Sequence, residues 1–240
     1  MAVTKDEQKV LAATHAVDVL ISKGKIFSGM KIGLGTGSTA MPAVKRLYER
    51  IKDGTLSDVK AVSTSFQTTL ACEEFGIPVY SLNDRVIAGT LDLAIDGADE
   101  IGPEGSLVKG GGAALLREKI IAYSAGEFVV VADESKAVSS HGTGFALPVE
   151  IIAEARVRVI KALSELGAEC TLREGVKKAG PVITDNGNMI LDCRWKAPVD
   201  PFKMEDLIDS ITGVVECGFF TKIRPMCFIA HSDGTVEERW

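Results

Sequence analysis

The segment Lys109–Lys119, KGGGAALLREK, carries a lysine, three adjacent glycines and an acid on the helix predicted to follow them. Glycine weakens regular structure, so three in a row before a helix indicate a backbone with positive φ or a group that approaches the backbone closely. The carboxylate of Glu118 is suited to act as a general base, and the ammonium of Lys109 to stabilise a developing oxyanion. The segment therefore predicts proton transfer on a substrate that approaches the main chain of Gly110–Gly112. A surface charge cluster of Glu118 with its two basic neighbours is the alternative, which helical periodicity does not exclude.

A second acidic segment, DGADE (Asp96–Glu100), follows the apolar run LDLAI. Three acids within five residues repel one another unless they coordinate a cation, share protons or bind hydroxyl groups. A solvated acidic turn is the alternative interpretation. The position of the segment at the end of a predicted buried strand favours a ligand site, because parallel sheets bind ligands at the carboxyl ends of their strands.

The segment GLGTGST (Gly33–Thr39) offers backbone N–H groups, three hydroxyl groups and the start of a predicted helix, which together suit an anion. Gly35, Gly37 and Ala40 also fit the dinucleotide pattern G-x-G-x-x-A. The next predicted strand, however, ends in STS, where a dinucleotide site needs an acid for the ribose. The sequence thus favours a phosphate monoester over NAD, and a tight turn of small residues remains as a third interpretation.

The elements around these segments alternate between strand and helix. Strands are predicted at 31–35, 58–64, 77–82, 91–100 and 127–133, and helices at 4–21, 44–51, 65–76 and 112–124. Thr4 followed by Glu7 is a capping-box pattern at the start of the first helix. Alternating strands and helices predict an α/β fold with right-handed β-α-β units and a parallel sheet covered on both faces.

The second half of the chain has a different pattern. It predicts a small α+β domain with an antiparallel sheet. The expected elements are a helix (153–166), a strand (168–173), two β-rich runs around Asp-Asn-Gly-Asn (181–193), a helix (204–211) and a strand (213–220). The final run, 226–238, is expected to return to the first sheet. The second domain is expected to close or line the site, or to serve mainly in subunit contacts.

The composition excludes several classes of protein. A formal net charge of −6 without a long basic run argues against a nucleic-acid or anionic-membrane role. The five cysteines contain no C-x-x-C pair and the three histidines lie far apart, which disfavours a zinc site or a Cys/His nucleophile and favours buried thiols in a reducing compartment. The first residues match neither a signal peptide nor a membrane span.

Taken in order, GLGTGST, DGADE, KGGGAALLREK and ADESK closely resemble the A-type ribose-5-phosphate isomerases. The resemblance covers nearly the whole chain, including LPVEI and TDNGNMILD in the second half. It implies interconversion of D-ribose 5-phosphate and D-ribulose 5-phosphate in the pentose phosphate pathway, without a metal or an organic cofactor. It also implies a Rossmann-like parallel-sheet domain (1–142 plus 217–240) and a smaller α+β, ferredoxin-like domain (143–216) inserted before the C-terminal strand.

The resemblance also implies roles for individual residues. Glu118 matches the base that moves a proton between C1 and C2 through an enediolate, and Lys109 would stabilise that intermediate. Asp96 and Asp99 match the acids that hold the sugar hydroxyls, with Asp96 also a candidate for assisting ring opening. The substrate-binding residues implied are Thr36, Gly37, Ser38, Thr39, Asp96, Gly97, Ala98, Asp99, Lys109, Gly110, Gly111, Gly112 and Lys136.

The expected partners are a sugar phosphate and other copies of the chain, as a homodimer or homotetramer in the cytoplasm, with no nucleic acid and no membrane. The segment Cys193–Pro201 is longer than in other versions of the family and leaves the local shape there open. A sugar-phosphate sensor is the alternative from another class, and the presence of Glu118 and Lys109 disfavours it. A deaminase of amino-sugar phosphates or a coenzyme A transferase would need motifs that the sequence does not contain.

Overall fold

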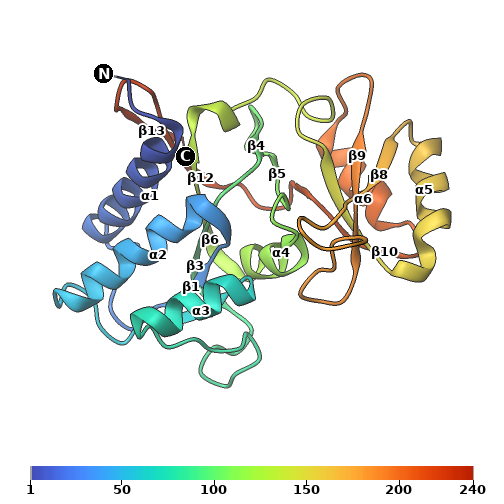
Figure 1. The fold of residues 1–240 in the computed structure, drawn as a ribbon. Coiled ribbons are helices and arrows are strands. Elements are labelled where there is room, and N and C mark those ends of the chain that lie inside the picture. The colour runs from blue at the N-terminus through green and yellow to red at the C-terminus, as the bar shows by residue number, and fades with distance from the viewer. Residues whose placement is uncertain (1, 240) are drawn as a thin grey trace. The chain divides into compact units, whose positions relative to one another are not determined.

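A computed structural model describes residues 2–239 and forms two compact units (Figure 1). The first contains the described residues up to Gly97, Arg117–Ser135 and the described residues from Ile223 on. The second contains Ala98–Leu116 and Lys136–Lys222. Compared with the domain boundaries expected from the sequence, residues 98–116, 136–142 and 217–222 pack with the second unit. The expected boundaries stay a prediction about which parts of the chain fold independently.

The first unit is built on a six-stranded sheet in the order β13-β12-β6-β3-β1-β2. All neighbouring strands are parallel except the terminal pair β12 and β13, so the α/β prediction and the return of the last run to this sheet are confirmed. The strands are β1 (Lys31–Leu34), β2 (Lys60–Ser63), β3 (Leu91–Asp96), β6 (Ala125–Asp133), β12 (Met226–Ala230) and β13 (Val236–Arg239).

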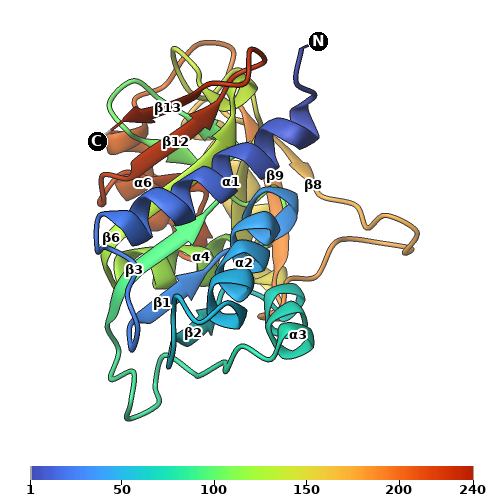
Figure 2. The same ribbon diagram turned by 90° about the vertical axis from the view of Figure 1, so that its left-hand side faces the viewer.

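Helices cover both faces of this sheet (Figure 2). They are α1 (Lys5–Ser22), α2 (Gly37–Lys52), α3 (Phe66–Phe75) and α4 (Leu115–Tyr123), which enters the first unit at Arg117. Ile32 and Leu34 point into the core shared with α1 and α2, whereas Gly33 between them faces Ile121 of α4. This alternation follows from the two-residue repeat of a strand and places α4 on the face opposite α1 and α2.

Local signals account for most of these elements. Thr4 and Glu7 form the predicted capping box at the start of α1. The strand predicted at 77–82 is wrong, because only Val79 makes a β-bridge, with Ala61. Pro78 has no N–H to donate to a ladder, so pairing beside β2 does not extend before Val79. After Val79 the chain turns, and Ser81 donates its N–H to Asp84 Oδ2 at 2.7 Å.

The second unit contains a four-stranded antiparallel sheet in the order β10-β7-β9-β8. Together with α5 and α6 it gives the βαββαβ order of a ferredoxin-like fold, as expected from the resemblance. A three-stranded sheet, β11-β5-β4, completes the unit. The elements are β4 (Glu100–Ile101), β5 (Leu107–Val108), β7 (Leu147–Ile151), α5 (Arg156–Glu165), β8 (Glu169–Leu172), β9 (Met189–Arg194), α6 (Pro201–Asp209), β10 (Val214–Cys217) and β11 (Phe219–Phe220), with the short 3₁₀ turn η2 (Ala153–Ala155). A second 3₁₀ turn, η1 (Glu134–Lys136), spans the boundary, and only Lys136 of it belongs to this unit.

Two predicted features of this half of the chain differ in detail. The single strand predicted at 213–220 is split at Gly218 between two sheets. Residue 218 is glycine because a Cβ there would lie 2.4 Å from the carbonyl oxygen of Lys109. The predicted hairpin around Asp-Asn-Gly-Asn closes through one antiparallel bridge, Ile183 with Met189, and only its second run becomes a full strand. Among the described residues, no helix has the length and apolar character needed to cross a membrane.

Candidate active site

Asp96 is the last residue of β3, at the carboxyl edge of the parallel sheet. Its side chain is 3% exposed, and Oδ1 accepts the N–H groups of Thr36 at 3.2 Å and Gly97 at 2.8 Å. A Cβ on Gly35 would lie 1.9 Å from this oxygen and 2.7 Å from the Cα of Asp96. Gly35 is therefore required by the close passage of β3, which explains one of the glycines in GLGTGST.

Hydroxyl groups from the neighbouring strand end meet the same loop. The Thr36 hydroxyl lies 2.7 Å from that of Thr64 and donates to Ser65 Oγ at 2.6 Å. The N–H of Gly37 donates to Gln67 Oε1 at 3.1 Å. The N–H groups of Thr36 and Gly37 thus have acceptors within the protein. Those of Ser38 and Thr39, in the first turn of α2, have no intrahelical acceptor and are the candidates for an anion.

Glu118 lies in the first turn of α4 and is 5% exposed. Its neighbour Lys119 is also buried, with Nζ 5.9 Å from the centre of the Tyr123 ring. The surface-cluster alternative for Glu118 is therefore wrong. The helix is held against the sheet one turn later, because Gly33 of β1 leaves room for Ile121, whose Cγ2 would be 2.3 Å from a Cβ at position 33.

In the second unit, the hairpin of β4 and β5 carries Asp99 at its entry and Lys109 at its exit. The N–H of Asp99 donates to Val108 O at 2.8 Å, and that of Lys109 to Gly218 O at 2.9 Å. The Lys109 side chain is 3% exposed, with Nζ 5.6 Å from the centre of the Phe220 ring. These two hydrogen bonds hold the backbones of Asp99 and Lys109, and so fix the positions of their Cα atoms.

The three glycines after Lys109 have three different structural reasons. Gly110 has φ +105°, a conformation that side chains disfavour. Gly111 donates its N–H to Asp99 Oδ2 at 2.8 Å, and a Cβ there would lie 2.7 Å from Oδ1. At Gly112, no heavy atom of the described residues lies within 4 Å of a Cβ position. Only Gly112 therefore presents the open backbone that the sequence suggested for all three.

Arg173, just after β8, binds the glycine loop and was not singled out by the sequence analysis. Its Nη1 donates to the carbonyl oxygens of Gly110 at 2.9 Å and Gly111 at 3.1 Å. Its Nε donates to Asp192 Oδ2 at 2.9 Å, which orients the guanidinium from the neighbouring strand β9. No local pattern marks Arg173, because its partners lie 62 and 63 positions earlier in the chain.

The third acid of DGADE has a structural role. Glu100 Oε2 lies 2.8 Å from Nδ1 of His141, whose Nε2 lies 3.0 Å from Ser106 Oγ. Glu100 Oε1 also accepts the N–H of Phe145 at 2.6 Å. The three side chains are buried. The mutual repulsion expected for DGADE is relieved because Asp96, Asp99 and Glu100 each have separate partners.

The predicted site residues divide between the two units. Thr36–Thr39, Asp96, Gly97 and Glu118 belong to the first, and Thr39 lies beside Gly97, 3.2 Å from a Cβ position there. The second unit contains Ala98, Asp99, Lys109–Gly112 and Lys136, which ends η1 and is partly buried. Within each unit the structure brings Asp96 to Thr36 and Asp99 to Gly111.

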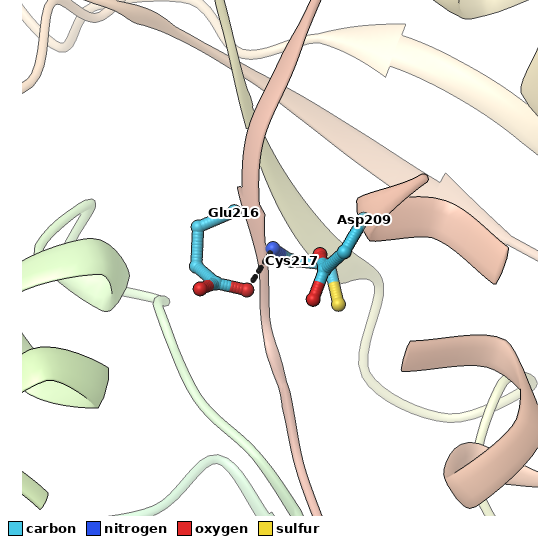
Figure 3. A group of neighbouring side chains, drawn as sticks. All are labelled: Asp209, Glu216 and Cys217. Atoms are coloured by element: carbon cyan, nitrogen blue, oxygen red, sulfur yellow. Dashed lines mark hydrogen bonds between the residues drawn. The ribbon is translucent and has the colours of Figure 1, made fainter. Parts of the chain in front are cut away.

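One group of the described residues has the spacing of metal ligands (Figure 3). Ligand atoms of Asp209, Glu216 and Cys217 lie within 4.8 Å of one another, at the end of α6 and on β10. Glu216 Oε1 also accepts the N–H of Cys217 at 2.9 Å. None of the predicted site residues belongs to this group.

Comparison with known proteins gives one consistent result. Residues 60–234 match the family model of ribose 5-phosphate isomerase A, also called phosphoriboisomerase A. The ribose-5-phosphate isomerases A of Treponema denticola and Treponema pallidum are 62% and 51% identical to the chain. These alignments cover 96% and 97% of the chain, and 97% and 92% of the relatives.

Solved structures agree with the sequence comparison. A D-ribose-5-phosphate isomerase in complex with phospho-erythronic acid superposes with a TM-score of 0.90 at 41% identity, over 98% of this chain and all of the other. Ribose 5-phosphate isomerase A of Methanocaldococcus jannaschii gives a TM-score of 0.88, also at 41% identity, over 97% of this chain and 98% of the other. The chain therefore belongs to the ribose 5-phosphate isomerase A family, whose members interconvert ribose 5-phosphate and ribulose 5-phosphate.

Proposed function

We propose that Glu118 is the general base of this isomerase. The observation that carries the proposal is a buried carboxylate in the first turn of α4, directly after the glycine loop. In the forward reaction Glu118 would remove the proton from C2 of the open-chain aldose, which leaves an enediolate. The same group then returns the proton to C1, while a proton moves from O2 to O1, so the sugar gains and loses no atoms.

Lys109 would stabilise the negative oxygen of the enediolate. Its buried ammonium lies in surroundings of low dielectric, where a charge stabilises an oxyanion more strongly than in water. Asp96 and Asp99 would hold the sugar hydroxyls. Each carboxylate is oriented by backbone N–H groups, from Thr36 and Gly97 or from Gly111, and an ionised carboxylate accepts several hydrogen bonds at once.

The phosphate would bind at the start of α2, with a contribution from Lys136. The N–H groups of the first helical turn and the hydroxyls of Ser38 and Thr39 suit a dianion. The phospho-erythronic acid bound by the related enzyme has a carboxylate and a phosphate, and its carboxylate resembles the charged end of the enediolate. The same compound is therefore a suitable inhibitor with which to measure binding to this chain.

The direct test is an isomerase assay on D-ribose 5-phosphate, with D-arabinose 5-phosphate, its C2 epimer, as the control substrate. We expect turnover of the ribose compound to ribulose 5-phosphate and at least about 10²-fold lower kcat/KM for the epimer, because a base fixed on α4 reaches C2 from one side. Equal turnover of both sugars would contradict the positioning proposed for Glu118.

The same assay run after exhaustive chelation tests the expectation that the reaction needs no metal. Activity is expected to be unchanged by EDTA, because Glu118 and Lys109 supply the base and the positive charge. Reversible loss of activity would instead point to a cation at DGADE or at the group of Asp209, Glu216 and Cys217.

Arg173 is proposed as a positioning residue for the glycine loop. Replacing it by lysine keeps a charge for Asp192 but removes the fork that also binds the carbonyls of Gly110 and Gly111. We expect kcat/KM to fall by about 10-fold, mainly through a higher KM, because the loop loses its orientation. Arg194→Lys, which changes an exposed arginine on the same pair of strands, is expected to leave kcat and KM unchanged. An equal effect of both substitutions, or a fall in thermal stability without a change in KM, would contradict the positioning role.

We also propose that the enzyme is a homodimer or homotetramer of the cytoplasm. Most soluble oligomers are built from identical copies with closed symmetry. Light scattering after size-exclusion chromatography would give the number of copies directly.

A further inference from the structure

Strands β8 and β9 are neighbours in the antiparallel sheet of the second unit (Figure 1). In their register, Cys170 of β8 lies directly opposite Cys193 of β9. Their sulfur atoms are 3.4 Å apart. Neither cysteine belongs to the proposed catalytic groups, and the sequence suggested only that cysteines would be buried thiols. A facing pair on two neighbouring strands allows chemistry that a single buried thiol does not.

The register of the strands suits a disulfide. The N–H of Arg173 donates to Ile190 O at 2.9 Å, so these two residues form a hydrogen-bonded pair of the ladder. Pairs alternate along an antiparallel ladder, and Cys170 with Cys193 is therefore a non-hydrogen-bonded pair. Cα atoms in such pairs are about 4.5 Å apart, within the range of about 4.4–6.8 Å found for disulfides. The two sulfurs can thus bond with little movement of the backbone.

The two thiols differ in a way that sets their order of reaction. The Cys193 thiol donates a hydrogen bond to Cys170 Sγ, which lowers the pKa of Cys170. The same hydrogen bond and full burial raise the pKa of Cys193. Cys170 is only partly buried, so a small oxidant reaches it first. The thiolate is the nucleophile of a cysteine, which makes Cys170 the attacking sulfur.

We propose that Cys170 and Cys193 form a reversible thiol–disulfide pair that a peroxide oxidises. The Cys170 thiolate attacks one oxygen of hydrogen peroxide, which forms an S–O bond, breaks the O–O bond and releases hydroxide. Cys193 then loses its proton and attacks the sulfenic sulfur, which forms the S–S bond and releases the second oxygen as water. In total, two thiols and one peroxide give one disulfide and two waters, and a dithiol reductant reverses the change.

The cross-link would fix β8 against β9 in the core of the second unit. Cys170, Leu172, Leu191 and Cys193 pack on the core face of the two strands, whereas Arg173 and Asp192 point to the other face. The disulfide therefore holds the register of β8 and β9 and leaves the ion pair of Arg173 and Asp192 on their other face unchanged. Closing a loop between positions 170 and 193 also restricts the unfolded chain, so the oxidised protein is expected to unfold at a temperature about 5 °C higher.

The test exposes the full-length protein to hydrogen peroxide and then counts free thiols in denaturant. Two of the five thiols are expected to disappear, the mass of the chain to fall by about 2 Da, and non-reducing peptide mapping to join Cys170 to Cys193. Dithiothreitol should restore all five thiols. A disulfide between two chains, or one that joins other cysteines, would overturn the proposal, as would an oxidised protein that unfolds at the same or a lower temperature.

Single substitutions test the order of attack. Cys193→Ser, which keeps a hydrogen-bond donor beside Cys170 Sγ but forms no disulfide, should leave a sulfenic acid at Cys170 that dimedone traps. Cys170→Ser should leave Cys193 unoxidised. Cys72→Ser is the matched control, because burial raises the pKa of Cys72 to about 11, and it should still lose two thiols. Loss of thiols at the wild-type rate in Cys170→Ser, or no dimedone adduct in Cys193→Ser, would contradict the assignment.

Discussion

Glu118→Gln is expected to lower kcat for ribose 5-phosphate by about 10²- to 10⁴-fold, with little change in KM. Glutamine has nearly the same shape as glutamate and fits the same buried place in α4, but its amide does not accept the proton from C2. An interaction that acts only in proton transfer changes kcat and leaves binding of the ground state intact. Steady-state kinetics measures the first effect, and titration with phospho-erythronic acid measures the second.

Two controls make this result specific. Glu118→Asp keeps a base but withdraws it by one methylene, so its kcat should lie between those of the wild type and Glu118→Gln. Circular dichroism and the thermal midpoint should show that both variants fold, because neither adds volume to the core. A Glu118→Gln enzyme with near-normal kcat would remove Glu118 from the role of base.

Lys109→Met should lower kcat/KM by about 10²- to 10³-fold, mostly in kcat. Methionine is unbranched and only one atom shorter than lysine, so it fills most of the same space beside the Phe220 ring, but it removes the positive charge that would meet the enediolate oxygen. The loss of charge weakens the transition state more than the substrate complex, because the full negative charge exists only after proton abstraction.

Lys119→Met is the matched control for this substitution. Both lysines are buried, 3% and 4% exposed, and both have the ammonium within 6 Å of an aromatic ring centre. The general effect of removing a buried ammonium is therefore shared by the two variants. If Lys119→Met loses as much kcat as Lys109→Met, the effect comes from folding, and Lys109 has no special part in the reaction.

Most of the fold follows from local chemistry that the sequence displays. Hydrophobic runs ending in glycine or acids predicted β1, β3 and β6, and the Thr4–Glu7 capping box predicted the start of α1. Local signals failed where a distant backbone interferes. Pro78 and the turn at Ser81 leave one predicted strand with a single bridge, and another is divided at Gly218, where the Lys109 carbonyl occupies the space of a Cβ.

In the candidate site, too, local motifs were visible in the sequence, whereas burial was not. The motifs around Asp96, Lys109 and Glu118 could be read from the sequence, and Asp96 lies where expected, at the carboxyl end of a parallel strand. The surface alternative for Glu118 could not be excluded from the sequence, because one turn of helical pattern does not show which face is buried. Burial of both Glu118 and Lys119 in the structure excludes it.

The sequence by itself therefore determined the fold class, the family and the residue types proposed for the chemistry, because these depend on short motifs and local periodicity. Only the tertiary structure decided which groups are partners: Glu100 with His141, Arg173 with the glycine loop, and Cys170 with Cys193. These partners lie 41, 63 and 23 positions apart. Such pairs form through strand register and core packing, which depend on the whole chain and leave no mark in a local pattern.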